Sequence, residues 1–380
     1  MNVRRAIGIT VVVLVAIVAA LALAVVTGLL GAPTAGIEDI GDWGEVTEER
    51  IDVITTAWVH NPNPIGLPLG DSLEVTYQLH MNDVRLADGA TGDIDVRSGN
   101  NTIEATTAIH TEQLPAWWAA FVQHDETIDV RAEPTAQVRG LVSTSIDLPS
   151  YETTLLTDST PIVTSLSESV SGLEGRYTTA DASREQLDGL VETGLVDAGA
   201  FDGIVPGGDA SPTVGYEIER GWATWGDVTD NATTLRVHLR LHNPSETVPV
   251  PAEPENLGLN VAMNDVDLFT AQGDDTTLAN PEDFAVRESL DRRVLLPGET
   301  TEAVYAVEMD NDRVAEWFRS HVKQGEQTDV RTELRLVFGV GDITFEVPPE
   351  NPIAYTCDLQ TGIFVDDQVT DTTCGEQLDR

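Results

Sequence analysis

The sequence predicts a mainly β protein: two tandem antiparallel β-sandwiches, each with one short helix, and a transmembrane helix at the N-terminus. Three observations carry this prediction: an uncharged N-terminal segment, a series of motifs that occurs twice, and runs in which apolar and polar residues alternate. Alternation with a period of two is typical of a strand with one buried face. Many short strands with few helices favour a sandwich.

The N-terminal segment from Ala6 to Leu30 contains no charged residue, and 15 of its 25 residues are Leu, Ile or Val. As a helix it would be about 38 Å long, enough to cross a hydrocarbon core of roughly 30 Å. Arg4 and Arg5 precede it, which favours an N-terminus inside the cell and the rest of the chain outside. A cleaved signal peptide is the alternative, although its apolar region would usually be shorter. We expect a single-pass anchor over residues 1–33.

A series of motifs occurs twice at one offset of 182 residues. The paired motifs are Trp43-Gly44 and Trp225-Gly226, His60-Asn61-Pro62 and His242-Asn243-Pro244, and Met81-Asn82-Asp83-Val84 and Met263-Asn264-Asp265-Val266. Trp117 matches Trp317 at an offset of 200, so the second copy has gained 18 residues. Such regularity indicates a duplicated unit. We expect domains at 34–160 and 212–366, a linker at 161–211 with a short helix that Ser183 would cap, and a flexible tail at 367–380.

The strands of each copy follow from alternation. The predicted strands are 53–60, 73–79, 84–86, 103–109, 127–132 and 138–148 in the first copy, and 235–241, 257–263, 266–268, 303–309, 328–338 and 343–347 in the second. Asn82-Asp83 and Asn264-Asp265 stand where a tight hairpin needs residues that tolerate positive φ.

The period changes to that of a helix after the fourth strand of each copy. In the first copy the apolar residues from Leu114 to Phe121 follow Thr111, which we expect to cap the helix. In the second copy Asn311 or Asp312 is expected to cap a helix that carries Trp317. Both helices present one apolar face for burial.

The order of these motifs resembles the water-stress-and-hypersensitive-response (WHy) domain of the late embryogenesis abundant type 2 family, a group of desiccation-related proteins. His60-Asn61-Pro62-Asn63-Pro64 is the closest local fit, and the second copy departs from it after Pro244. The resemblance covers both copies. It implies an immunoglobulin-like or fibronectin-III-like β-sandwich, a role in stress tolerance, and no catalytic residues.

The charge of the chain limits its partners. It has 64 acidic and 21 basic residues, a formal net charge of −43, and Lys323 as its one lysine. This charge excludes a nucleic-acid partner, which needs a positive surface. The 41% hydrophobic residues exclude a wholly disordered chain. A folded chain with this charge repels itself in dilute buffer. Salt at about 1 M reduces the Debye length to roughly 3 Å and screens that repulsion. We therefore expect a halophile's protein, haloarchaeal-like in composition.

The sequence predicts no metal, cofactor or catalytic site. Cys357 and Cys374 lack metal-site spacing, and they form either one disulfide or two free thiols. Acidic clusters at 273–275 and 310–312 offer oxygen ligands for calcium but lack the EF-hand spacing, so we predict surface or cap roles. No nucleophile elbow or Walker loop is present.

Several further side chains were candidates for contacts. We predict that His60 and His242 are strand-end residues bonded to a backbone carbonyl. Trp43, Trp225, Trp117 and Trp317 fit core anchors better than sugar-stacking platforms, because their places within the repeat are fixed. Trp58 and Trp222, without counterparts in the other copy, are predicted to be exposed contacts. Asn100 and Asn231 are glycosylation acceptors if the domains lie outside the cell.

These observations favour a non-catalytic, membrane-anchored stress or desiccation protein with two surface-displayed domains that meet an unknown protein or envelope partner. The first alternative is a cell-surface interaction or adhesion module. The second is a secreted enzyme or calcium-dependent binder. Sandwiches carry many functions, so the fold class names no ligand.

Overall fold

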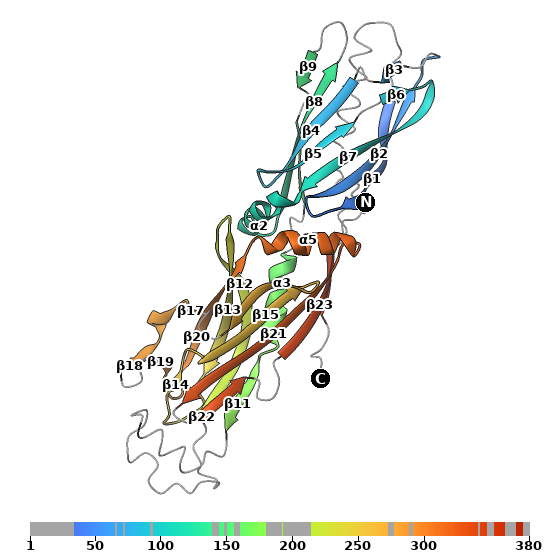
Figure 1. Cartoon of the computed structure of the whole chain (residues 1–380). Helices are drawn as coiled ribbons and strands as arrows, with labels where there is room; N and C mark the ends of the chain where they lie inside the picture. Colours follow the sequence, from blue (N-terminus) through green and yellow to red (C-terminus); the bar gives the residue numbers. More distant parts are fainter. Residues whose placement is uncertain are drawn as a thin grey trace. The chain divides into compact units, whose positions relative to one another are not determined.

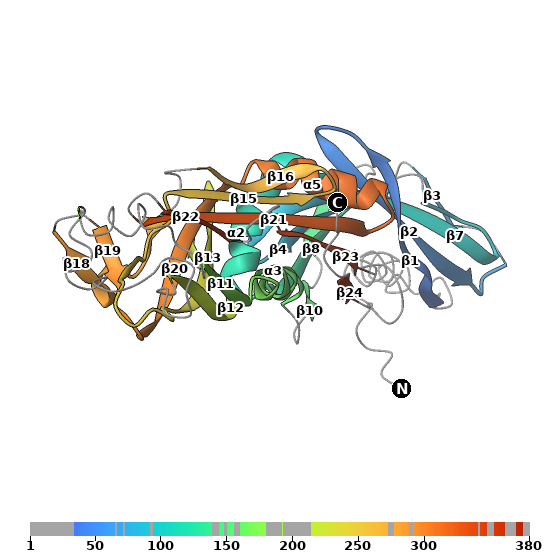
Figure 2. The same cartoon turned by 90° about the horizontal axis from the view of Figure 1, so that it is seen from below.

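The computed structural model of the chain describes residues 34–64, 67–70, 73–91, 94–138, 144–147, 150–155, 160–179, 192, 214–272, 277–288, 292–340, 343–347, 353–361 and 370–374. It divides into two compact units. The first comprises the described residues up to Thr160 together with Val314–Thr328 and Gln360–Asp371, and the second comprises the remainder. Both are built mainly from antiparallel strands, as predicted (Figures 1 and 2).

The first unit has one continuous sheet of eight strands. In spatial order they are β1 (Thr34–Val46), β2 (Arg50–Asn61), β7 (Gly99–His110), β5 (Val84–Thr91), β4 (Leu73–Met81), β8 (Ile128–Val138) and β10 (Tyr151–Leu155), and β9 (Thr144–Asp147) also pairs with β8. An immunoglobulin-like sandwich would have two separate sheets. Here β5 pairs with β4 and, over Ala87–Ala90, with β7, which joins the two halves.

The second unit keeps its two larger sheets apart. One has the order β11 (Gly175–Thr179), β12 (Val214–Val228), β13 (Ala232–His242), β20 (Thr300–Asp310) and β17 (Thr277–Leu278). The other has the order β16 (Val266–Gln272), β15 (Asn256–Met263), β21 (Gln327–Val340), β23 (Ile353–Thr361) and β24 (Thr370–Cys374), with β22 (Ile343–Val347) on β21. β16 contacts β20 without pairing with it over the residues described.

The strand order of the first unit recurs in the second. β1-β2-β7 corresponds to β12-β13-β20, and β5-β4-β8 with β9 corresponds to β16-β15-β21 with β22. The small pair β3 (Leu67–Gly70) and β6 (Ile94–Val96) corresponds to β14 (Val250–Pro251) and β19 (Arg292–Leu295). The extra residues of the second copy form β17, a 3-10 turn η3 (Pro281–Asp283) and β18 (Ala285–Arg287). The sequence repeat is therefore also a repeat of strand order.

The predicted alternation and hairpins are confirmed. Val53, Thr55, Ala57 and Val59 are buried on β2 while Ile54 and Trp58 are exposed. In β13 the residues from Leu235 to Leu241 follow the same pattern. The hairpin residues have positive φ in both copies: 49° and 63° at Asn82 and Asp83, and 52° and 62° at Asn264 and Asp265. Asparagine and aspartate tolerate this conformation better than other non-glycine residues.

The two predicted helices are present, but Thr111 and Asn311, two of the residues expected to cap them, bond elsewhere. The first begins with the 3-10 turn η1 (Thr111–Gln113) and continues as α2 (Leu114–Gln123), and the second is α5 (Arg313–Lys323). The Thr111 hydroxyl donates to the Glu48 carbonyl at 2.6 Å. The Asn311 amide donates to the Thr229 carbonyl at 2.9 Å. Both side chains thus fix a helix start to the hairpin between the first two strands of their copy, because that bond satisfies a carbonyl the hairpin leaves open.

The segment predicted as a linker begins with ordered structure that belongs to the second unit. Residues Pro161–Ser171 form α3, and β11 then pairs with β12. Ser165 and Ser169 looked like linker residues, yet they are buried, and their hydroxyls donate to the carbonyls four residues earlier at 2.8 and 3.0 Å. This back-bonding lets serine sit on a buried helix face. The helix predicted after Ser183 lies outside the described residues.

The described residues include part of the predicted C-terminal tail but not the predicted N-terminal anchor. The prediction of a flexible tail over 367–380 is wrong for Thr370–Cys374, which form β24 beside β23. Of the helices within the described ranges, none combines the length and apolar character that crossing a membrane would require. The segment Ala6–Leu30, on which the predicted anchor rests, lies outside those ranges.

Candidate functional site

A hollow of about 900 Å³ lies on the outer face of the first unit's sheet, across β8, β4, β5 and β7. Its lining is mostly polar and comes from alternate residues that point away from the core. The principal lining residues are Thr76, Gln78, Arg85, Asp88, Ala90, Thr106, Glu133 and Thr135. This volume is within the range of small-ligand sites, which is about 300–1,000 Å³. We call this feature the sheet-face hollow.

The floor of the sheet-face hollow depends on a glycine. A Cβ on Gly89 would lie only 1.8 Å from Cζ of Tyr77, so only glycine lets the tyrosine ring lie beneath β5. The Tyr77 hydroxyl meets the Thr107 hydroxyl at 2.5 Å in the core. Burial raises the pKa of Tyr77 to about 12, so the phenol stays protonated. The floor is therefore a fixed, neutral layer.

One carboxylate in the sheet-face hollow is held between two bases. Oδ1 of Asp88 is 2.7 Å from Nη2 of Arg85, and Oδ2 is 2.9 Å from Nε2 of His110. Burial alone would raise the pKa of Asp88, but the hydrogen bonds and charges of Arg85 and His110 outweigh burial and lower that pKa. Asp88 is therefore an ionised acceptor near neutral pH, which suits it to binding a polar group and not to donating a proton.

Three of the four predicted core anchors lie in an aromatic cluster of the first unit, and the fourth, Trp225, packs against Phe269 in the second unit. Trp117 and Trp317 are 6% and 5% exposed. Trp118 meets Trp317 edge to face with ring centroids 5.8 Å apart, and Phe318 meets Trp43 at 6.3 Å. Such edge-to-face pairs stabilise the fold beyond the contribution of the apolar area that these rings bury. The four tryptophans of this cluster have packing roles, as the repeat predicted for three of them.

A chain of hydrogen bonds crosses the same cluster and includes both ring nitrogens of His321. Nε1 of Trp317 donates to the Thr328 hydroxyl at 3.0 Å, and that hydroxyl lies 2.7 Å from Nδ1 of His321. Nε2 of His321 lies 2.8 Å from the Thr361 hydroxyl, which donates to Glu326 at 3.2 Å. The Thr328 hydroxyl thus bridges Trp317 and His321. Burial lowers the pKa of His321 to about 4, so the ring is neutral near pH 7.

The predicted partners of the two repeated histidines are wrong. Nδ1 of His60 lies 2.7 Å from Oδ1 of Asn100, and Nδ1 of His242 lies 2.9 Å from the Thr300 hydroxyl. Both partners are side chains directly across the ladder, on β7 and β20. The reason is that strand pairing already uses the nearby backbone carbonyls. Sequence reasoning missed these partners because it could not give the register.

The remaining candidate residues are distributed over both units. Trp58 is 38% exposed, as predicted, whereas Trp222 is half-buried between Arg220 and His238. Asn100 and Asn231 are exposed, and their glycosylation stays a prediction. The acidic cluster at 273–275 lies outside the described residues. In the cluster at 310–312, Asn311 is buried in the contact with Thr229.

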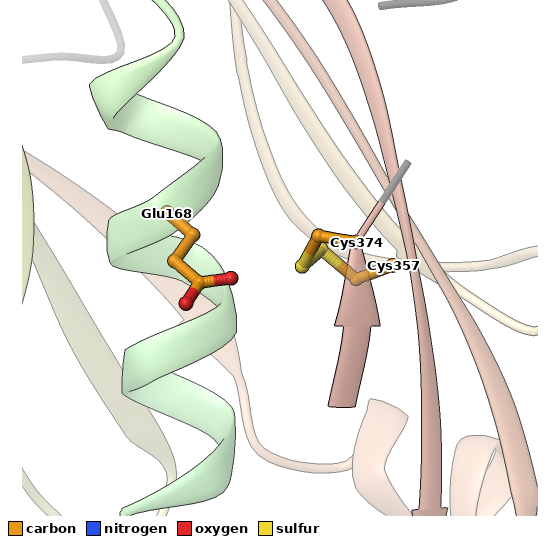
Figure 3. A group of neighbouring side chains, drawn as sticks. All are labelled: Glu168, Cys357 and Cys374. Carbon is orange, nitrogen blue, oxygen red and sulfur yellow. A yellow bond between two sulfur atoms is a disulfide. The ribbon is translucent and has the colours of Figure 1, made fainter. Parts of the chain in front are cut away.

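The two cysteines form a disulfide between β23 and β24, which decides the alternative that the sequence left open. Glu168 on α3 points toward this disulfide (Figure 3), and its carboxylate lies within 4.8 Å of both sulfur atoms. These three residues are the one group of possible metal ligands within the described ranges. Since oxidised cysteines offer no thiolate, the group does not form a metal site.

Comparisons with known proteins address the first unit most directly. The sequence model of a family described as "Late embryogenesis abundant protein" matches residues 56–154, which include every residue that lines the sheet-face hollow. This match supports the late embryogenesis abundant type 2 family for that part of the chain. No curated protein matches the sequence.

Three solved structures are similar in part. A protein from Archaeoglobus fulgidus is 19% identical, with 34% of this chain and 98% of that chain covered and a TM-score of 0.26. The protein AT1g01470 from Arabidopsis thaliana is 15% identical, with 32% and 83% covered and a TM-score of 0.23. The exo-chitosanase CsxA of Amycolatopsis orientalis is 12% identical, with 77% and 25% covered and a TM-score of 0.16. Scores this low support no statement about function.

Proposed function

We propose that the chain is a non-catalytic, stress-related protein of the late embryogenesis abundant type 2 kind that displays two WHy-like domains outside the cell. The observation that carries this proposal is the family match over residues 56–154. The recurrence of the same strand order in the second unit supports extending it to both copies. The disulfide between Cys357 and Cys374 supports an oxidising location, since such bonds persist mainly outside the cytosol.

The sheet-face hollow is the contact surface that we assign to this role. It offers a guanidinium, carboxylates, hydroxyls and an amide on a rigid sheet, all able to bond a polar partner. Sites on strands hold their side chains more precisely than sites on loops. The partner is therefore a polar surface, protein or envelope, that meets the outer face of β4, β5 and β7.

Survival of a strain that lacks the chain, after drying and after salt shock, tests the proposal. Ala90→Trp would fill the sheet-face hollow from β5 without altering the Arg85–Asp88 pair. Val286→Trp is the matched control, since Val286 is 66% exposed on β18. We expect the wild-type chain and the control to restore survival and Ala90→Trp to restore much less. Unchanged survival of the deletion strain, with lost cell-surface contacts, would favour the adhesion alternative.

The membrane anchor is tested separately by fractionation. An anchor over residues 1–33 predicts that the mature chain sediments with membranes and dissolves only in detergent. Release of a shortened chain into the medium would show that the segment is removed and that this part of the proposal is wrong.

High salt is the third element of the proposal. The net charge of −43 repels itself, and salt at about 1 M screens that repulsion much better than salt at about 0.1 M, where the Debye length is roughly 10 Å. We expect the β-sheet circular-dichroism signal to decrease as salt falls through that range. A constant signal would contradict the halophilic assignment.

A further inference from the structure

A second, smaller hollow lies in the second unit, between α3 and β12. It encloses about 400 Å³, and one face of α3 together with Arg220–Ala223 of β12 forms its walls. Helix and strand approach closely there, since a Cβ on Gly221 would lie 2.5 Å from the Val170 carbonyl oxygen. We call this feature the α3 hollow.

The wall of the α3 hollow is fixed by bonds from helix to strand. The amide of Ala223 donates to the Ser167 hydroxyl at 3.3 Å, and the amide of Gly221 donates to Glu174 at 3.4 Å. The side chains that accept from these amides of β12 come from α3 and from the turn that follows it, at an edge where no further strand pairs over the residues described. The backbone of the site is therefore held by the fold, and only side chains remain to meet a ligand.

A stack of side chains orients Arg220 beside the α3 hollow. His238 is held by Glu302 at Nδ1 and by Thr224 at Nε2, both at 2.7 Å. The Trp222 ring stacks on His238 with centroids 4.9 Å apart and planes 14° apart. Cζ of Arg220 then lies 4.9 Å from the centroid of Trp222. Because the stack fixes both side chains, the Arg220 guanidinium and the Trp222 indole N–H are pre-organised donors.

Three groups around the α3 hollow remain available to a ligand. Over the residues described, the Arg220 guanidinium, the Trp222 indole N–H and the Glu168 carboxylate have no hydrogen-bond partner. Arg220 and Glu168 are exposed, and Trp222 is half-buried. Figure 3 shows Glu168 projecting from α3 toward the Cys357–Cys374 disulfide. The α3 hollow is therefore lined by donors from the strand and by an acceptor from the helix.

The mixture of charges selects the ligand class. An anion bound at Arg220 would meet the carboxylates of Glu168 and Glu174, and a cation bound at those carboxylates would meet Arg220. A neutral polyhydroxylated ligand satisfies both, because its hydroxyls donate to carboxylates and accept from a guanidinium. We propose that the α3 hollow binds a neutral oligosaccharide, with Arg220 and Trp222 as donors and Glu168 as acceptor.

The first unit does not provide the same chemistry at the equivalent positions. Arg220 and Trp222 correspond to Glu38 and Ile40 at the repeat offset of 182. The site thus arises where the second copy departs from the first, and it extends beyond the stress-related role proposed above.

Saturation-transfer NMR on the full chain in high salt tests the proposal. The chain is kept in a zwitterionic, sugar-free detergent, and the probes are neutral cellotetraose, chitotetraose and maltotetraose, with anionic tetragalacturonate and cationic chitosan tetramer as comparators. We expect transfer to at least one neutral probe and none to the charged ones. Arg220→Gln and Glu168→Gln should each weaken binding about tenfold, the loss of a charge-assisted hydrogen bond. Trp222→Phe keeps the stack and should weaken binding about threefold.

The matched control is Arg236→Gln, because Arg236 lies on the neighbouring strand β13 and pairs with Asp227. It should leave binding unchanged, and thermal melting of each variant should match the wild type. Three outcomes would overturn the proposal: no transfer to any neutral probe, transfer to charged probes only, or binding that persists in both Arg220→Gln and Glu168→Gln. Because the site and the assay differ from those of the sheet-face hollow, either proposal can fail without the other.

Discussion

In the interior of the first unit, the hydroxyls of Tyr77 and Thr107 meet, whereas the second unit has Leu259 and Val307 at the equivalent positions. A hydroxyl is likewise absent from the second unit at Val237, the counterpart of Thr55, and Gly89 is matched by the larger Ala271. The strand pairing is unchanged, since Tyr77 lies opposite Gly89 and Leu259 lies opposite Ala271. One framework therefore accepts a polar or an apolar interior, provided that each large residue faces a small one.

The first unit also has a buried polar group without a hydrogen-bond partner at a position where the second unit has an apolar residue. The buried hydroxyl of Thr55 has no hydrogen-bond partner, while Val237 has the same shape without the hydroxyl. A buried polar group without a partner costs free energy. The first unit thus has a less stable interior at this position than the second.

The largest expected difference between the copies concerns His321, whose counterpart in the first copy is Phe121. The pKa of His321 is about 4 in the folded chain and 6.5 in the unfolded chain, so between these values the unfolded chain binds more protons. Stability from this residue is complete above pH 6.5 and is lost as pH falls toward 4. Urea unfolding should show that the free energy of unfolding of the wild type decreases between pH 7 and pH 4.5. In His321→Phe this decrease should be smaller by roughly 2–3 kcal/mol. Parallel losses in wild type and variant would contradict this.

The next largest effect is expected at Gly89. Gly89→Ala copies Ala271 into the first unit but places a Cβ into the Tyr77 ring. We expect a loss of about 2–3 kcal/mol in the free energy of unfolding, typical of overpacking. The triple variant Gly89→Ala with Tyr77→Leu and Thr107→Val copies the second unit at these three positions and should recover most of that loss. An equally unstable triple variant would show that the interiors are not interchangeable.

The hairpins should respond alike in both units. Asn82 and Asn264 have φ of 49° and 52°, and each side chain bonds the backbone of the strand beside the hairpin at 2.8 Å. Asn82→Ala and Asn264→Ala should each cost about 1–2 kcal/mol, from backbone strain and a lost hydrogen bond. Chemical denaturation of the two variants checks this. A large effect in one copy alone would limit the structural equivalence of the repeat.

The smallest effect is a gain at Thr55. Thr55→Val copies Val237, keeps the shape and removes the unpartnered hydroxyl, so stability should rise by about 1 kcal/mol. Differential scanning calorimetry would detect the higher melting temperature. The reverse change, Val237→Thr, is the control and should destabilise the second unit. A loss of stability in Thr55→Val would reveal that the hydroxyl has a role in the first unit.

The sequence by itself determined the repeat, most strands, the hairpin asparagines and the two aromatic helices. These features depend on local conformation and on periods that a single strand or helix imposes, as with the alternation from Val53 to His60. The partners of Thr111, Asn311, His60 and His242 could not be predicted in the same way. Each partner is set by register or by a distant hairpin.

Only the tertiary structure decided the rest. The joining of the first unit's strands through β5, the helix at Pro161–Ser171 and the disulfide all arise from contacts between segments distant in sequence. So do the two hollows, because each is built from residues that are unremarkable alone and acquire a common surface by strand pairing or helix packing. Local sequence fixes the conformation of a segment, whereas its neighbours depend on the burial and hydrogen bonding of the whole chain.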